Sequence, residues 1–99
     1  GGTLHNKSAL VWQTASHRDK LATCADFIAA MWEEGNFVAE IQGSIEDTDD
    51  MKPYAQQLVK YINESTERDP DPNRNRSMFA NQKVSDLAIM GMVIMKWTK

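Results

Sequence analysis

Residues 83–97, KVSDLAIMGMVIMKW, decide the fold because they include the longest apolar run of the chain, from Leu87 to Met95. The length of this segment and its methionine content favour a helix, with a buried strand as the competing interpretation. A helix that is apolar on all sides is either enclosed by other elements or presents an outer face to a partner. We therefore predict a helix over residues 83–97 that packs at the centre of the domain.

The same run is too short to cross a membrane. A transmembrane helix needs roughly 20 predominantly apolar residues, about twice the length of the stretch from Leu87 to Met95. No membrane span is therefore predicted.

Two further segments have the apolar spacing of amphipathic helices. Ser16 can cap a helix over residues 17–34, and Gly35 ends it, because glycine adopts the left-handed conformation at little cost. Pro53 suits the first turn of another helix, over residues 51–64, where its missing N–H leaves no hydrogen bond unmade. The apolar faces comprise Leu21, Cys24, Ala25, Ile28, Met31 and Trp32 in the first helix, and Met51, Tyr54, Ala55, Leu58 and Ile62 in the second.

The remaining segments are shorter or more polar. Residues 8–14 fit either a short helix or an extended arm, and residues 37–42 fit a short helix somewhat better than a strand. We expect residues 1–7 to be a disordered or trimmed start. Residues 66–77 contain two prolines and no aliphatic side chain, which predicts a polar loop.

Together, these patterns predict an all-α fold. The 99 residues leave room for one core, so we expect a single domain over residues 1–99. It is expected to contain four to five helices, with helix 83–97 packed centrally against helices 17–34 and 51–64.

Composition limits the classes of partner. The hydrophobic share of 41% and the charged share of 25% are typical of a soluble globular protein. The net charge is -3 and the basic residues are mostly scattered, whereas nucleic-acid binding relies on a clustered basic surface, so we predict no nucleic-acid partner. Cys24 is the only cysteine, which excludes an intrachain disulfide. This favours the cytoplasm slightly, and a mature exported form is also compatible.

The polar stretch places oxygen-bearing side chains at every second position, as a calcium loop does: Asp69, Asp71, Asn73 and Asn75. Counting from the first of these, Arg74 stands where such a loop needs glycine, and Ala80 stands where it needs glutamate. We therefore predict no metal site, and expect these side chains to bond to local backbone groups. The acidic run 46–50 is interpreted as a solvated approach to the following helix.

Candidate nucleophiles lack a suitably placed base. Ser16, His17 and Asp19 are near neighbours on one predicted helix and cannot converge on a reacting atom. Cys24 lies two helical turns from His17, roughly 10 Å away, and belongs to the apolar face. His5 could approach Cys24 only through tertiary folding. We predict no catalytic residue, no cofactor and no enzymatic activity.

Methionines and tryptophans are the remaining functional lead, because thioethers and indoles line adaptable binding surfaces as well as cores. A small bundle has few apolar residues with which to cover every side of residues 84–97. A second copy of the chain, another protein or a small apolar ligand would cover the rest. The expected interaction surface or ligand pocket comprises Trp12, Trp32, Met90, Met92, Met95 and Trp97.

We therefore predict a small helical interaction module that acts by hydrophobic association and self-associates. A carrier of a small apolar ligand is one alternative. Another comes from Thr23-Cys24-Ala25-Asp26-Phe27, which resembles a Thr-Cys-x-Asp-Phe stretch in small helical acid-stress chaperones of the bacterial periplasm. The resemblance covers five residues, and this chain lacks the second cysteine of that family's disulfide. It implies a chaperone that opens at low pH as its carboxylates become protonated.

Overall fold

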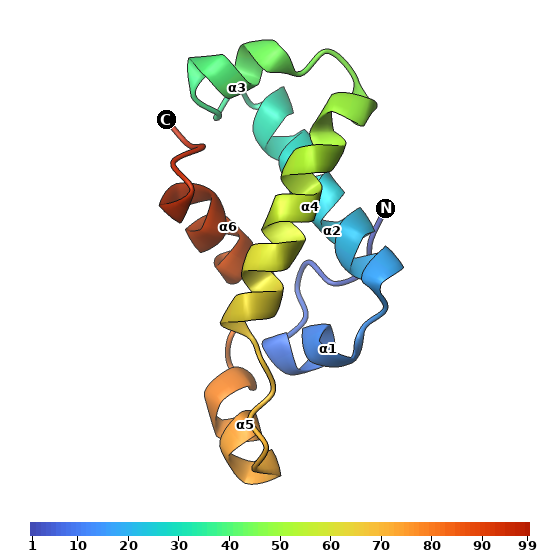
Figure 1. Ribbon diagram of the computed structural model, residues 1–99, viewed down its shortest axis with the longest axis vertical. Helices are drawn as coiled ribbons and strands as arrows, with labels where there is room; N and C mark the ends of the chain where they lie inside the picture. The colour runs from blue at the N-terminus through green and yellow to red at the C-terminus, as the bar shows by residue number, and fades with distance from the viewer.

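Six helices and no strand make up the computed structural model, which describes residues 1–99 (Figure 1). The all-α prediction is confirmed, with six helices instead of the expected four or five. The molecule is elongated, with extents of 45 × 24 × 18 Å. Its radius of gyration of 13.7 Å exceeds the roughly 12.6 Å expected of a compact chain of this length. The helices are α1 (Ala9–Thr14), α2 (His17–Glu33), α3 (Ala39–Ser44), α4 (Thr48–Ser65), α5 (Pro72–Phe79) and α6 (Val84–Ile94).

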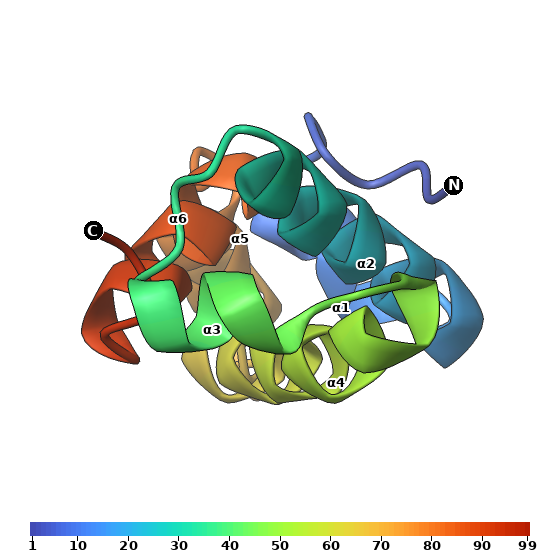
Figure 2. The same cartoon turned by 90° about the horizontal axis from the view of Figure 1, so that it is seen from above.

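The middle of the bundle is occupied by α4, and not by α6 as expected. α4 packs against α2 on one side and against α6 on another, as both ribbon views show (Figures 1 and 2). The two long helices, α2 with 17 residues and α4 with 18, pack on each other, and α6, with only 11 residues, is too short to run along both of them. The buried residues of α4 are Met51, Ala55, Leu58, Val59 and Ile62.

The predicted ends of α2 are confirmed to within one residue, whereas α4 begins earlier than predicted. The Ser16 hydroxyl accepts a hydrogen bond from the backbone N–H of Asp19 at 3.1 Å, and Gly35, with a φ of 67°, follows the last turn of α2. α4 begins at Thr48, three residues before the predicted start, because Asp47 caps it. Pro53 is therefore the sixth helical residue and lies beyond the first turn.

Residues 8–14 and 37–42, whose sequences fit either a helix or an extended segment, are both largely helical. Ser8 caps α1, so residues 8–14 form a helix and not an extended arm. Ala39–Ser44 forms α3, which crosses one end of the bundle in Figure 2. Phe37 is extended and makes an isolated bridge with Thr98, so the beginning of segment 37–42 does pair as a strand would.

Residues 1–7 are ordered against α2, so the expectation of a disordered start is wrong. Leu4 is buried in the core, and its N–H donates to the Thr23 hydroxyl at 3.2 Å. The N–H of Gly2 donates to Asp26 at 2.9 Å, and that of Thr3 donates to Asp19 at 2.8 Å. These partners lie 16 to 24 residues away in the sequence, and no local pattern could indicate them.

The polar stretch 66–77 is not a loop throughout, because α5 begins at Pro72 and projects from one end of the molecule (Figure 1). The Asp71 carboxylate caps α5 by accepting from the N–H of Asn73 at 2.9 Å, and proline is favoured in the first turn. Phe79 at the other end of α5 is buried in the core. The helix was missed because it has no apolar stripe and relies on its cap and this single anchor.

Candidate functional site

The helix α6 has two apolar faces, and only one of them is covered. The residues of its inner face, Val84, Leu87, Ala88, Gly91 and Met92, are buried. Gly91 permits a close approach to α4, since a Cβ at this position would lie 2.6 Å from the Tyr61 ring and 3.1 Å from the Leu58 side chain. α6 therefore packs closely on α4 at Gly91, and a larger residue at this position would push the two helices apart.

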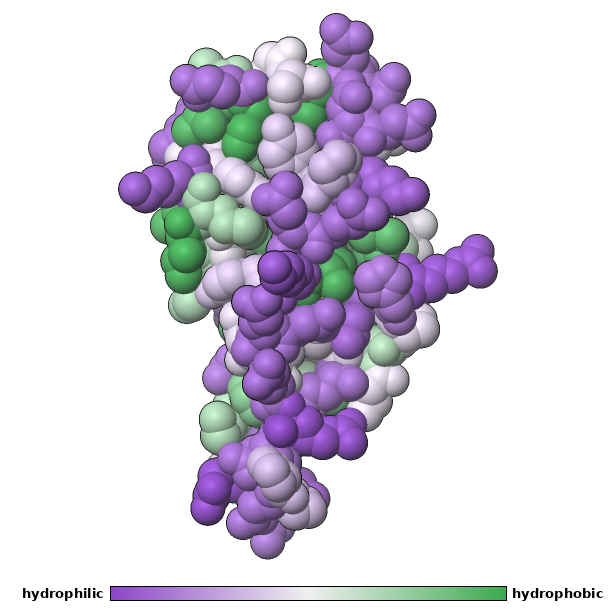
Figure 3. Space-filling model, in the orientation of Figure 1, coloured by the Kyte–Doolittle hydropathy of each residue, from purple (hydrophilic) through white to green (hydrophobic).

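The outer face of α6 consists of large apolar side chains in solvent. Ile89, Met90, Val93 and Ile94 are 57%, 53%, 54% and 59% exposed, and we call these four residues the α6 patch. Successive α-helical residues are rotated by about 100°, which places the four on one continuous arc opposite the inner face. Hydrophobic side chains are visible in the space-filling view at the edge of the molecule where α6 lies (Figure 3).

The C-terminal end of α6 is folded back onto the bundle. Lys96 has a φ of 63°, a left-handed conformation that is costly for a residue with a Cβ. The turn lets the Trp97 N–H donate to the Met92 carbonyl at 3.0 Å and places the Trp97 ring edge-on to Tyr54, 5.3 Å between centroids. The N–H of Val38 then donates to the Trp97 carbonyl at 2.8 Å. α6 therefore ends at Ile94, three residues before the predicted end of the helix at residue 97.

Of the six residues expected to form the interaction surface, only Met90 belongs to the α6 patch. Trp12, Met92 and Trp97 are buried at 0%, 2% and 7% exposure, and Trp32 and Met95 are partly buried. Ile89, Val93 and Ile94 were missed because methionine and tryptophan were weighted above aliphatic residues. A helical projection of residues 84–94 separates these residues into two apolar faces. It does not indicate which of the two faces packs against α4.

The three tryptophans do not share a cavity. The indole N–H of Trp12 donates to the Asn63 side chain at 2.9 Å, and that of Trp32 donates to the Gln42 carbonyl at 3.2 Å. Trp97 packs on Tyr54 near the opposite end of the bundle from Trp12. No surface hollow is lined by more than one of the three indoles. These side chains serve the core, and a tryptophan-lined ligand site does not form.

One hollow has a predominantly apolar lining, and it lies between α2 and the first half of α4. Its volume is about 460 Å³, and Leu21, Ala25, Met51 and Ala55 contribute to its walls. Arg18, Asp26, Asp49 and Lys52 also line it, so its rim is charged. The hollow is open to solvent and is distinct from the α6 patch.

The candidate nucleophile is chemically inert as placed. Cys24 is fully buried, and burial raises the pKa of its thiol to about 12, so it stays protonated at neutral pH. His5 interacts with Asp26, Nε2 to Oδ2 at 2.9 Å, and its ring stands edge-on to Phe27 at 5.3 Å between centroids. His17 is exposed on the first turn of α2. The structure thus pairs His5 with Asp26, and the same carboxylate accepts a hydrogen bond from the N–H of Gly2.

Acidic groups act mainly as anchors and caps. Hydrogen bonds from Thr3 lower the pKa of Asp19, which ties the first residues of the chain to α2. No group of three or more His, Cys, Asp or Glu side chains converges as metal ligands would. Asp71, from the stretch that resembled a calcium loop, caps α5.

Comparisons with protein-family models, curated proteins and solved structures found no match to this chain. None of the six helices combines the length and the hydropathy needed to cross a membrane.

Proposed function

We propose that the protein is a small non-enzymatic helical interaction module that self-associates through the α6 patch. One observation carries this proposal. The four apolar side chains of the α6 patch lie on two successive turns of one helix face, and more than half of the surface of each is exposed to solvent. Burial of such a face is favourable by roughly 25 cal/mol per Å², before the costs of association are subtracted.

The charges at the two ends of α6 favour an antiparallel pairing of two copies. Asp86 is exposed in the first turn, and Lys96 is exposed just beyond the last turn. Neither side chain forms an ion pair within the chain. When two α6 helices cross in antiparallel fashion about the α6 patch, Asp86 of each copy comes to the level of Lys96 of the other. A two-fold interface of this kind is self-complementary and closes as a dimer.

The expected affinity is modest. α6 is roughly 17 Å long, so its outer face alone is smaller than the roughly 800 Å² per partner of a standard stable interface. We therefore expect dissociation constants of the order of micromolar, and association that strengthens if partly buried neighbours such as Met95 join the interface.

Sedimentation velocity across a concentration series tests the proposal. The wild-type chain should shift from monomer to dimer between about 1 and 100 μM. Val93→Gln should abolish the shift, because it places a polar amide at the centre of the α6 patch. Val11→Gln is the matched control, since Val11 is also exposed, at 42%, but lies on α1. A monomer at every concentration, or equal loss in both variants, would contradict self-association through α6.

The charge pairing has its own test. Asp86→Lys and Lys96→Asp should each weaken dimerisation, and the double reversal should restore it, because opposite charges again face each other across the interface. Failure of the double variant to recover, while Val93→Gln still abolishes association, would reject the antiparallel arrangement and leave the α6 patch itself in place.

A further inference from the structure

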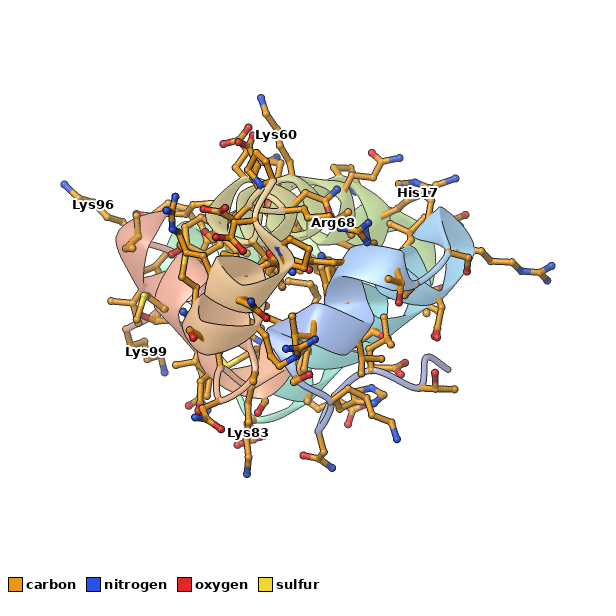
Figure 4. All side chains as sticks on the ribbon, turned by 90° about the horizontal axis from the view of Figure 1, so that it is seen from below. His17, Lys60, Arg68, Lys83, Lys96 and Lys99 are labelled. Atoms are coloured by element: carbon orange, nitrogen blue, oxygen red, sulfur yellow. The ribbon has the colours of Figure 1, made fainter.

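A polar hollow of about 480 Å³ lies between α1 and the segment that leads into α5. Arg68 and Arg76 line it together with Gln13 and Thr14 of α1. A smaller hollow of about 210 Å³ shares Gln13 and Arg68 and adds Lys20. We call these two neighbouring hollows the trough, and Gln13 and Arg68 line both parts. Figure 4, which views the molecule from the α5 end, places Arg68 between α4 and α1.

The trough carries positive charge that no carboxylate of the chain neutralises. Lys20, Arg68 and Arg76 take no part in any of the three ion pairs of the molecule, which are His5–Asp26, Lys60–Glu64 and Arg74–Asp69. Asp69 is the only acidic residue lining the trough, and Arg74 lies 3.7 Å from its carboxylate. The chain as a whole has a net charge of -3, but its three unpaired cations give the trough a positive local charge.

The polar partners of these cations are neutral. The ammonium group of Lys20 donates to the side-chain amide oxygen of Asn63 at 3.1 Å and lies 5.3 Å from the Trp12 ring centroid. Arg76 makes a long contact of 3.4 Å with the side-chain oxygen of Asn73, and Arg68 makes no hydrogen bond to the rest of the chain. The guanidinium of Arg68 thus retains all its donors for a ligand.

The side chains of Gln13 and Asn75, of which Asn75 is buried and Gln13 half-buried, tie the lining of the trough together. The side chains of Gln13 and Asn75 exchange two hydrogen bonds, at 2.8 and 3.0 Å, and Asn75 is only 9% exposed. The Gln13 amide also donates to the Thr66 carbonyl at 3.0 Å, and Asn75 accepts from the N–H of Asp69 at 3.0 Å. These bonds join α1, α5 and the connection between α4 and α5, so the backbone that carries Arg68 and Arg76 is held in place before any ligand arrives.

We propose that this trough binds a small organic anion with a double negative charge, of the dicarboxylate or phosphomonoester class. Guanidinium groups suit such ligands because their planar donors match carboxylate and phosphate oxygens in pairs. The volume of the larger hollow lies within the usual range for small-molecule sites. Six of its nine lining residues have polar or charged side chains, which can bind the charged groups of a ligand. The site lies at the α1–α5 end of the molecule and does not depend on the α6 patch.

The proposed anion site can be tested by titration calorimetry and amide NMR on the full chain. The probes are inorganic phosphate and succinate, each added at low ionic strength. Both probes should shift the amide signals of Gln13 and Asn75. Arg68→Gln and Arg76→Gln should each weaken binding about fivefold to tenfold, through the loss of a charge-assisted hydrogen bond. Arg68→Lys should recover only part of the affinity, since it keeps the charge and loses the paired donors.

Lys83→Gln is the control, because it removes one positive charge from an exposed position outside the trough. It should change the affinity less than about twofold. Equal weakening by Lys83→Gln would mean that the anions respond to overall charge, and would overturn the proposal. Binding of an acidic peptide without binding of phosphate or succinate would also overturn it, and would point to a protein partner.

Discussion

The helices α4 and α6 lie side by side, yet the less hydrophobic of the two covers its apolar side chains more completely. α4 directs five apolar residues into the core and polar residues to solvent, and it has neighbours on two sides. α6 consists almost entirely of apolar residues after Asp86, but only its inner face is covered (Figure 1). Burial here follows from position between two partners and not from apolar content. The surplus hydrophobicity of α6 is what makes it the candidate interaction surface.

The largest effect should come from the core of α4. Leu58→Ala is expected to lower the free energy of unfolding by about 3 kcal/mol, because Leu58 is fully buried and its removal leaves a cavity. Ile94→Ala on the outer face of α6 should cost less than about 0.5 kcal/mol. Urea denaturation followed by tryptophan fluorescence, at a concentration where the chain is monomeric, measures both values. Comparable losses would show that the outer face is covered after all.

The contact between the two helices is tested by Gly91→Ala. The new methyl group would lie 2.6 Å from the Tyr61 ring, and the resulting displacement should destabilise the protein by about 1–2 kcal/mol despite the better helix propensity of alanine. Gly43→Ala is the matched control, since nothing lies within 4 Å of its Cβ position in α3. That variant should be neutral or gain up to about 1 kcal/mol. A stable Gly91→Ala variant would mean that α6 is not held by close approach to α4.

The turn that ends α6 offers a stabilising change. Lys96→Gly should raise the free energy of unfolding by about 1 kcal/mol, because glycine adopts the positive φ of this position without strain. Gly35→Ala places a Cβ on the other residue with a positive φ, and it should lower the free energy of unfolding by about the same amount. Thermal unfolding monitored by circular dichroism compares them. If both variants shift in the same direction, left-handed strain does not control these helix ends.

The smallest effect concerns residues 1–7, which hydrogen bonds from Gly2, Thr3 and Leu4 hold against α2. The pKa of Asp19 is lowered from the ordinary value of 3.8 by the Thr3 hydrogen bonds, so its contribution is complete above that pH. It is lost as the pH falls below 3.8 and through the lower pKa of the folded state. Amide NMR should show the signals of Thr3 and Leu4 change in this range while those of Leu58 stay fixed. Asp19→Ala should show the change already at neutral pH.

Cys24 provides an independent measure of how tightly α2 is covered. Its buried thiol, with a pKa raised to about 12, should resist an alkylating reagent at pH 8 until the protein unfolds. Labelling kinetics followed by mass spectrometry, with and without urea, check this expectation. Rapid labelling in the absence of denaturant would indicate that α2 separates readily from the bundle.

Sequence reasoning placed the long elements correctly where local signals were strong. The start of α2 at Ser16 and its end at Gly35 were both predicted, because a cap and a left-handed glycine act within a few residues. α5 was missed because it has a cap and one anchor, Phe79, but no periodic face. The bonds from Gly2 and Thr3 to α2 were missed because their partners are distant in the sequence.

The sequence predicted the helix that carries the candidate site, but it did not predict which face of that helix is exposed. The sequence predicts that residues 83–97 form an apolar helix that the rest of the chain covers only in part, and Met90 is among the expected surface residues. The placement of Trp12, Met92 and Trp97 in the core could not be read from residue types, because indoles and thioethers serve cores and interfaces equally well.

By itself, the sequence determined that the protein is helical, and also where its clearest helices begin and end. These features depend on hydrogen bonds and apolar periods within a few residues. Only the tertiary structure decided that α4 lies in the middle, that α6 turns Ile89, Met90, Val93 and Ile94 to solvent, and that Arg68 and Arg76 line one trough. Such features depend on which helices meet after folding, and a helix with two apolar faces carries no local mark of the face that its neighbour will cover.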